Sequence, residues 1–201
     1  EKMPALPEAT ALRLRLEAAQ REEKWQEVLA SARRLRALES MDAAKAAALI
    51  RQAHLNEASS RLALGADLFA WWKRLPKEER FDPEFLAALA RLAIERAQGG
   101  KVRPILEAAL DKRWLPELVR RYPACLDAAE RQAALARLES WLQAHPEEPA
   151  VLEALVELCL ELKLWGKARD YLARLRRLGA DPKGLERFAA RLQSAEAGRG
   201  G

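Results

Sequence analysis

The sequence has little of what disulfide-rich, membrane-spanning and nucleotide-binding proteins are built from. Its 201 residues include two cysteines, two histidines and nine glycines, and aromatic residues make up 6%. Two cysteines 34 residues apart are too few for a disulfide framework and too dispersed for a metal site. There is no run of about 18 apolar residues to span a bilayer and no glycine-rich nucleotide loop. We expect Cys125 and Cys159 to be buried, reduced thiols.

What the sequence does have is typical of helices. Half of its residues are apolar, few of them β-branched, and Ala, Leu, Arg, Glu and Lys dominate. These are the strongest helix formers, so the composition predicts an all-α protein. The 35 basic and 30 acidic residues give a net charge of +5. Because the two signs alternate every few residues, the pattern favours solvated helix faces over a nucleic-acid surface.

Apolar residues recur at helical spacing along the whole chain. They predict eleven helices, near residues 12–19, 25–35, 43–58, 62–75, 83–97, 102–112, 115–122, 127–144, 149–162, 164–178 and 182–194. Short connections make consecutive helices antiparallel neighbours. We therefore expect residues 1–194 to form one right-handed α-solenoid of helical hairpins, with 182–194 as the terminal cap and 195–201 as a disordered tail.

The clearest repeat lies near the C-terminus. Eight residues fall at the spacing of the packing positions in a degenerate tetratricopeptide hairpin: Leu152, Leu155, Val156, Cys159, Trp165, Ala168, Leu172 and Leu175. Small Ala168 would let the two helices cross closely, and Trp165 would cap the hairpin. Between residues 43 and 75 the register of the repeat is ambiguous.

Several segments resemble the HemY-type tetratricopeptide proteins of proteobacteria, in the expected order. The most specific is Leu164-Trp165-Gly166-Lys167-Ala168-Arg169-Asp170-Tyr171-Leu172. The others are Trp25 with Val28, Trp72 with Leu75-Pro76, Arg80 with Asp82-Pro83, and Glu139-Ser140-Trp141-Leu142 with His145-Pro146. Together they span residues 12 to 192. Pro104 and Val156 depart from the small residues usual at those positions, which affects local packing only.

The resemblance implies a bacterial inner-membrane protein in which two membrane-spanning helices precede a helical region that faces the cytoplasm. It also implies a role in a late step of haem biosynthesis, where the region would hold pathway enzymes as a non-catalytic scaffold. The chain starts without Met and ends in Gly-Arg-Gly-Gly, so we expect a soluble fragment of a longer protein that carries the anchor. The alternative is a soluble tetratricopeptide adaptor with no link to haem.

A stripe of acidic residues is the main candidate for a partner-binding groove. Glu153, Glu157 and Glu161, called the acidic stripe below, share one helix face at i, i+4 and i+8. The repeat register places them on the first helix of a hairpin, which lines the concave surface of such arrays. The acidic stripe favours a partner with a basic segment, unless Arg169 or other neighbours neutralise it. Further groove candidates are Arg13, Glu17, Arg51 and Arg96.

Adjacent Trp71 and Trp72 are a second candidate. Neighbouring helix residues point about 100° apart, so we expect one ring in the core and the other partly exposed. The exposed ring would anchor a partner or the membrane interface, or pack on the next hairpin.

Other candidates have simpler alternatives. The basic clusters 33–36 and 174–177 lie near helix C-termini, where cations offset the dipole; contact with anionic headgroups is the alternative. His54 and His145 each lack a paired ligand, which disfavours haem or metal coordination. No nucleophile–base set is recognisable. We expect no cofactor, no nucleic-acid partner and no enzymatic activity.

Overall fold

The computed structural model describes residues 7–197, apart from the side chain of Glu196. Every regular element in this range is helical, which confirms the predicted all-α class. There are twelve α-helices, one more than expected, and three short 3-10 helices in the part described. The chain divides into two compact units after Leu89, at a point inside α6 (Pro83–Glu95).

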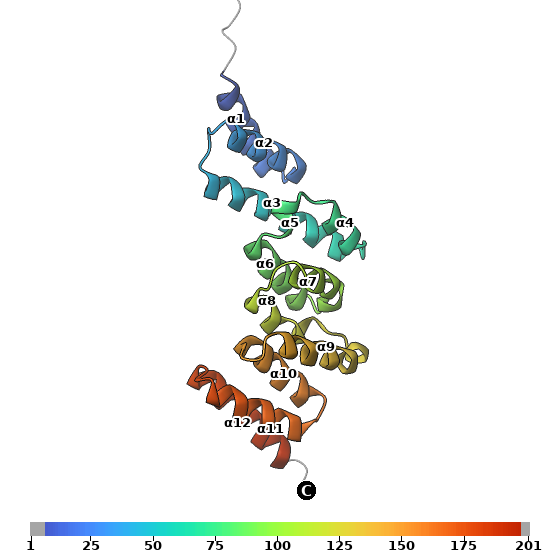
Figure 1. The fold of residues 1–201 in the computed structure, drawn as a ribbon. Helices are drawn as coiled ribbons and strands as arrows, with labels where there is room; N and C mark the ends of the chain where they lie inside the picture. Colours follow the sequence, from blue (N-terminus) through green and yellow to red (C-terminus); the bar gives the residue numbers. More distant parts are fainter. Residues whose placement is uncertain (1–6, 198–201) are drawn as a thin grey trace, which may run out of the picture. The chain divides into compact units, whose positions relative to one another are not determined.

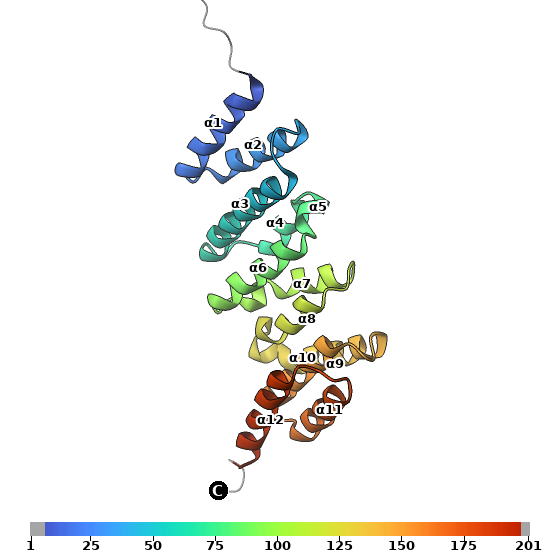
Figure 2. The same ribbon diagram turned by 90° about the vertical axis from the view of Figure 1, so that its left-hand side faces the viewer.

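The first unit is built from hairpins of consecutive helices. It contains α1 (Glu8–Arg21), α2 (Trp25–Ala37), α3 (Ala43–Ala63), α4 (Leu68–Arg74), α5 (Lys77–Arg80) and the start of α6. Figures 1 and 2 show α1 beside α2 and α2 beside α3. The core between them is made of small and branched residues from all three helices, among them Leu16, Ala32, Leu35 and Ile50.

The helices predicted at residues 43–58 and 62–75 have different limits in the structure. One helix, α3, runs without interruption from Ala43 to Ala63. Ser60 does not break it, because its hydroxyl donates to the carbonyl of Asn56 one turn earlier, at 3.2 Å. The helix ends at Ala63 and is followed by Gly65, whose φ is +66°. The short α4 begins at Leu68 behind the N-cap Asp67. The expected break therefore lies several residues too early.

The second unit continues from α6 with the same kind of hairpin. Its elements are η1 (Gly99–Lys101), α7 (Arg103–Leu110), α8 (Pro116–Arg121), η2 (Pro123–Cys125), η3 (Ala128–Glu130), α9 (Arg131–Ala144), α10 (Pro149–Glu161), α11 (Trp165–Arg177) and α12 (Pro182–Ala197). Residues 195–197, expected in a disordered tail, belong to α12; residues 198–201 lie outside the described part. Pro104 sits in the first turn of α7, where no backbone donor is lost.

Helix α10 is the centre of the second unit. It packs against α8, α9, α11 and α12, and nine of its thirteen residues are buried. Its closest partner is α11, at the predicted hairpin, where Ala168 is fully buried. The other four residues of α10, Pro149 in the first turn and the acidic stripe, are half-buried. A helix that is apolar on almost every side needs neighbours on almost every side.

One type of turn ends helices in both units. The residue just past the helix adopts a left-handed conformation at Glu23, Glu39, Gly65, Ala97, Lys163 and Gly179. After it, a backbone N–H returns to a carbonyl five residues earlier, as from Ser40 to Leu35 and from Leu164 to Cys159. This is the Schellman pattern, which reverses the chain within three residues. Four of the six positions carry a side chain where glycine is favoured.

Replacing Glu39 by Gly should therefore stabilise the protein. The left-handed conformation at φ +50° strains a residue with a Cβ, and the exposed Glu39 side chain forms no hydrogen bond or ion pair in the described structure. We expect a gain of about 0.5–1 kcal/mol in the free energy of unfolding by urea denaturation, after the entropy cost of Gly. Ala30→Gly, on the exposed face of α2, should instead cost about 1 kcal/mol. A loss at both positions would contradict the strained turn.

Candidate functional site

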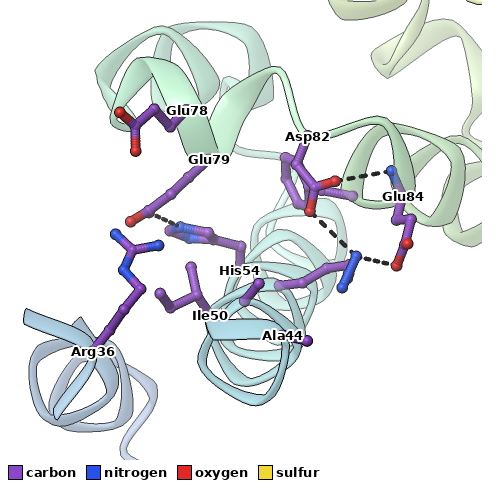
Figure 3. A pocket seen from close by; sticks show the side chains of 11 residues that line it. Arg36, Ala44, Ile50, His54, Glu78, Glu79, Asp82 and Glu84 are labelled. Carbon is purple, nitrogen blue, oxygen red and sulfur yellow. Dashed lines mark hydrogen bonds and ion pairs between the residues drawn. The ribbon is translucent and has the colours of Figure 1, made fainter. Parts of the chain in front are cut away.

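A pocket of about 400 Å³ in the first unit brings together charged residues from four elements. Figure 3 shows Arg36 from α2, Ala44, Ile50 and His54 from α3, and Glu78 and Glu79 from α5 around it. Asp82 and Glu84 border it at the start of α6. The helical spacing of residues 47, 50, 51 and 54 aims one face of α3 at this pocket.

Two side chains of the pocket lining, His54 and Glu79, form a buried charge network with Arg33. Glu79 is 8% exposed and His54 is 1% exposed. Arg33 grips the Glu79 carboxylate with two hydrogen bonds, from Nε at 2.8 Å and Nη2 at 2.5 Å. Nε2 of His54 lies 2.7 Å from Oε2 of the same carboxylate. The network thus ties α5 to both α2 and α3.

The electrostatics of the network keep Glu79 ionised. Burial alone would raise its pKa, but hydrogen bonds from His54 and Arg33, together with their charge, lower the pKa from 4.5 to about 2. An ionised carboxylate only accepts, so Nε2 of His54 carries the proton of their bond. The imidazole packs against the rings of Trp71 and Phe85, at centroid distances of 6.1 and 5.8 Å, and these two rings also contact each other. His54 is therefore positioned as a structural donor.

The rim of the pocket carries a second set of charges. Arg51 pairs with Asp82 at 3.3 Å and also with Glu84. Arg36 is half-buried and forms no ion pair in the part of the chain described, and its guanidinium points toward the space beside Glu79 in Figure 3. Arg51, expected to lie in a partner-binding groove, is thus committed to two carboxylates of its own chain.

The prediction of an exposed tryptophan at residues 71 and 72 is wrong. Trp71 is 4% exposed and Trp72 is 3% exposed. Trp71 packs against His54 and Phe85, whereas Trp72 packs between Phe69 and Phe81. Because α4 is short and has aromatic partners on two sides, both rings can be buried. Trp72 also donates Nε1–H to the carbonyl of Arg80 at 3.0 Å.

The acidic stripe in the second unit is neutralised by neighbouring helices. Glu153 pairs with Arg120 of α8 at 2.6 Å, and Glu157 accepts from Arg191 of α12 at 2.7 Å on both oxygens. Nε of Arg131 lies 2.9 Å from Glu161, although not aligned for a hydrogen bond. Burial raises the pKa of Glu161, while Arg131 opposes this shift. The structure therefore agrees with the alternative in which neighbouring residues neutralise the acidic stripe. It does not agree with a stripe of unpaired carboxylates.

The remaining sequence candidates are dispersed. Arg13 donates to the carbonyl of Ser40 at 2.7 Å, and Glu17 is exposed on α1. Arg96 is exposed in the second unit. Of the basic cluster at 33–36, Arg33 and Arg34 pair with Glu79 and Glu8, so the cluster holds helices together.

Residues of the family-like segments contact one another. Glu139 accepts from Lys167 Nζ at 2.7 Å and from the Tyr171 hydroxyl at 3.0 Å. The hydrogen bond from Lys167 is the main cause that lowers the pKa of Glu139. His145 stacks on the ring of Trp114 with centroids 3.8 Å apart. Two of the segments quoted for the resemblance, 139–142 and 164–172, are thus in contact.

Hydrogen-bonded side chains 31–34 residues apart recur in both units. In the second unit they join alternate helices: Arg120 with Glu153, Glu157 with Arg191, and Glu139 with Tyr171. In the first unit Arg51 reaches Asp82 and Glu84, and Gln26 reaches Glu57. Contacts that join alternate helices at this spacing are expected when the repeat is 34 residues long. Gln26 and Glu57, by contrast, lie on the consecutive helices α2 and α3.

Two kinds of reactive group, metal ligands and cysteine thiols, can be checked directly in the structure. No group of three or more His, Cys, Asp or Glu within the described residues is arranged to hold a metal. Cys125 and Cys159 are buried and unpaired with each other, as predicted, and burial raises their pKa values to about 12 and 11. Thiols held in the neutral form are poor nucleophiles.

Comparisons with known proteins do not identify the chain: no protein-family model, no curated protein and no solved structure matches it. Among the helices described, none combines the length and apolar character that crossing a bilayer requires.

Sequence reasoning missed the buried charge network. The sequence feature that could have revealed the network is His54, which lies between the apolar residues Ile50 and Ala58 on one face of α3. A polar side chain at such a position needs a buried partner. Glu79 could not be named as that partner, because it lies 25 residues away in a short helix that the periodicity did not reveal.

Glu79→Gln should destabilise the protein by about 3 kcal/mol at neutral pH, because it removes the charge that Arg33 and His54 surround. Urea denaturation followed by circular dichroism would measure the loss. The neighbouring Glu78 is exposed and forms no ion pair in the described structure, so Glu78→Gln should change stability by less than about 0.5 kcal/mol. Equal effects of the two substitutions would contradict the network.

The pH dependence follows from the lowered pKa of Glu79. Its carboxylate contributes fully above its unfolded pKa of 4.5, and this contribution is lost as the pH falls toward about 2. The stability difference between the wild type and Glu79→Gln should therefore shrink between pH 5 and pH 2. A difference that stays constant over this range would contradict an ionised Glu79.

A double-mutant cycle should detect the pair between Glu157 and Arg191. Both side chains are partly exposed, so we expect a coupling energy of about 0.5–1 kcal/mol between Glu157→Gln and Arg191→Gln, reduced in about 1 M salt. The same cycle with Glu153, which pairs with Arg120, in place of Glu157 serves as the control. Equal coupling in both cycles would show a diffuse charge effect and contradict a specific pair.

Proposed function

We propose that this protein is a non-catalytic scaffold that holds partner proteins on stacked tetratricopeptide-type hairpins in a right-handed α-solenoid. The observation that carries the proposal is the set of side-chain contacts at 31–34 residues, which join alternate helices in the second unit. Tetratricopeptide repeats are 34 residues long, and their first helices line a binding surface.

The shared turn supports the same proposal. The left-handed residue after α1, α2, α3, α10 and α11 reverses the chain in the same way each time. Repeated hairpins with the same reversal stack side by side and present an extended surface without a deep cleft. Such a surface suits a protein partner better than a small substrate.

The non-catalytic part of the proposal rests on how the ionisable groups are paired. Glu79, the most deeply buried carboxylate of the first pocket, is occupied by Arg33 and His54. Arg51 is occupied by Asp82 and Glu84 at the rim. A general acid or base needs a group that faces the substrate with its proton available. Here these charges hold helices together.

The resemblance to HemY-type proteins also suggests a cellular location and a class of partner. On that basis the chain belongs to an inner-membrane protein that holds late haem-biosynthesis enzymes on its cytoplasmic side. The contact of Glu139 with Lys167 and Tyr171 supports the resemblance, because it couples two of the matching segments. A tetratricopeptide adaptor unrelated to haem has the same hairpins and remains the alternative.

Site-specific photo-crosslinking in cells tests this proposal. A photoreactive amino acid replaces exposed Glu17 on the first helix, α1, of the full-length protein, and exposed Ala30 on the second helix, α2, as a matched control. We expect position 17 to capture a specific partner protein and position 30 to capture little. Haem-pathway enzymes among the captured proteins support the membrane-scaffold form, and unrelated proteins support the alternative. Crosslinks from neither position would contradict a scaffold that binds through its first helices.

A further inference from the structure

A second pocket, of about 500 Å³, lies in the second unit where α8, α10 and α12 meet near the turn after α11. We call it the C-terminal pocket. The lining residues that matter for ligand binding are Arg120, Glu153, Lys183, Leu185, Arg187 and Phe188. It includes one residue of the acidic stripe, Glu153, so it occupies the surface on which the sequence placed the groove.

The charges around the C-terminal pocket leave a positive excess. Arg120 and Glu153 neutralise each other at 2.6 Å. Asp181 is held by the backbone N–H of Gly184 at 3.0 Å, as the N-cap of α12. Lys183 and Arg187 are exposed and form no ion pair within residues 7–197. They lie four residues apart, one above the other on the same face of α12.

The pocket also has an apolar floor. Leu185 is half-buried, and Phe188 and Leu175, which also line the pocket, are buried. The guanidinium of Arg187 lies over the Phe188 ring, 5.0 Å from its centroid, which places a cation beside the apolar surface. A matching ligand has carboxylates next to an aliphatic or aromatic group.

We propose that the C-terminal pocket binds an acidic peptide segment of a partner protein. One apolar side chain of the segment packs on Leu185 and Phe188, and its carboxylates pair with Lys183 and Arg187. The proposal rests on the scaffold function above and gives the chemistry of the partner. The proposed partner segment is acidic, whereas the acidic stripe led us to expect a basic one. The difference arises because the stripe's carboxylates are already paired with Arg120, Arg131 and Arg191.

A nucleic acid fits this surface less well than an acidic peptide. A phosphate chain needs a continuous row of cations, whereas Glu153 and Asp181 interrupt the lining here. The apolar floor has no role in binding a phosphate backbone. Apolar side chains at the centre with charged residues at the rim are typical of protein interfaces.

Fluorescence anisotropy with two labelled peptides tests the proposal. The acidic probe is a peptide of about twelve residues with Leu at every third position and Glu elsewhere, and the basic probe has Lys in place of Glu. The pocket variant carries Lys183→Glu and Arg187→Glu. The matched control carries Lys112→Glu and Arg113→Glu, which are exposed in the second unit outside the pocket lining and change the net charge equally.

We expect the wild type to bind the acidic probe and not the basic one. The pocket variant should weaken this binding by at least about tenfold, and the control by less than about twofold, because only the former reverses the cations that meet the carboxylates. Equal weakening in both variants, or preference for the basic probe, would overturn the proposal. So would tighter binding of a single-stranded oligonucleotide, displacement by inorganic phosphate at equal ionic strength, or a dimer that the pocket variant abolishes.

Photo-crosslinking of the full-length protein separates this proposal from the scaffold function. If the pocket variant still captures the partner as strongly as the wild type, the C-terminal pocket is not its binding site although the scaffold function stands. If the wild type captures no protein at all, the scaffold function itself fails. Both proposals are supported if the pocket variant loses capture of the partner while the variant with Lys112→Glu and Arg113→Glu retains it.

Discussion

The structure depends on the constraint that α10 is apolar on nearly every side and must be covered from every side. Its nine buried residues contact α8, α9, α11 and α12, so no single hairpin of the second unit buries its own surface. Successive helices have to stack for this burial to be complete. The ion pairs of Glu153 and Glu157 lie at the edges of these contacts, where they set which helix lies beside which more than they add stability.

In the first unit, helices are held together by a buried charge network as well as by an apolar core. Its core of small and branched residues joins α1, α2 and α3, and the buried charge network then ties α5 to α2 and α3. A buried carboxylate with a low pKa is costly to place and strongly destabilising to leave unpaired. Arg33, His54 and Glu79 therefore fix the position of α5, a single helical turn whose only buried residue is Glu79.

The helices and the C-terminal hairpin could be predicted from the sequence because helical periodicity is a local signal. The position of Ala168, fully buried where α10 meets α11, is an example. The break expected near residue 60 was wrong, because the Ser60 hydroxyl bonds back to its own helix. The prediction of an exposed tryptophan was wrong, because both rings are buried against residues beyond the end of α4, Phe81 and Phe85. The ion pairs of the acidic stripe join residues 33 and 34 apart, so they needed the stacking of helices to be seen.

Hydrogen exchange in a variant with a cavity in α10 tests the stacked-repeat account most directly. Leu155→Ala removes a fully buried side chain at the centre of the second unit. The account predicts faster amide exchange in α8, α9, α11 and α12, which all contact α10, while α1 and α2 keep their rates, since a repeat is coupled chiefly to its neighbours. Faster exchange confined to α10 itself, or equally fast in α1 and α2, would contradict it.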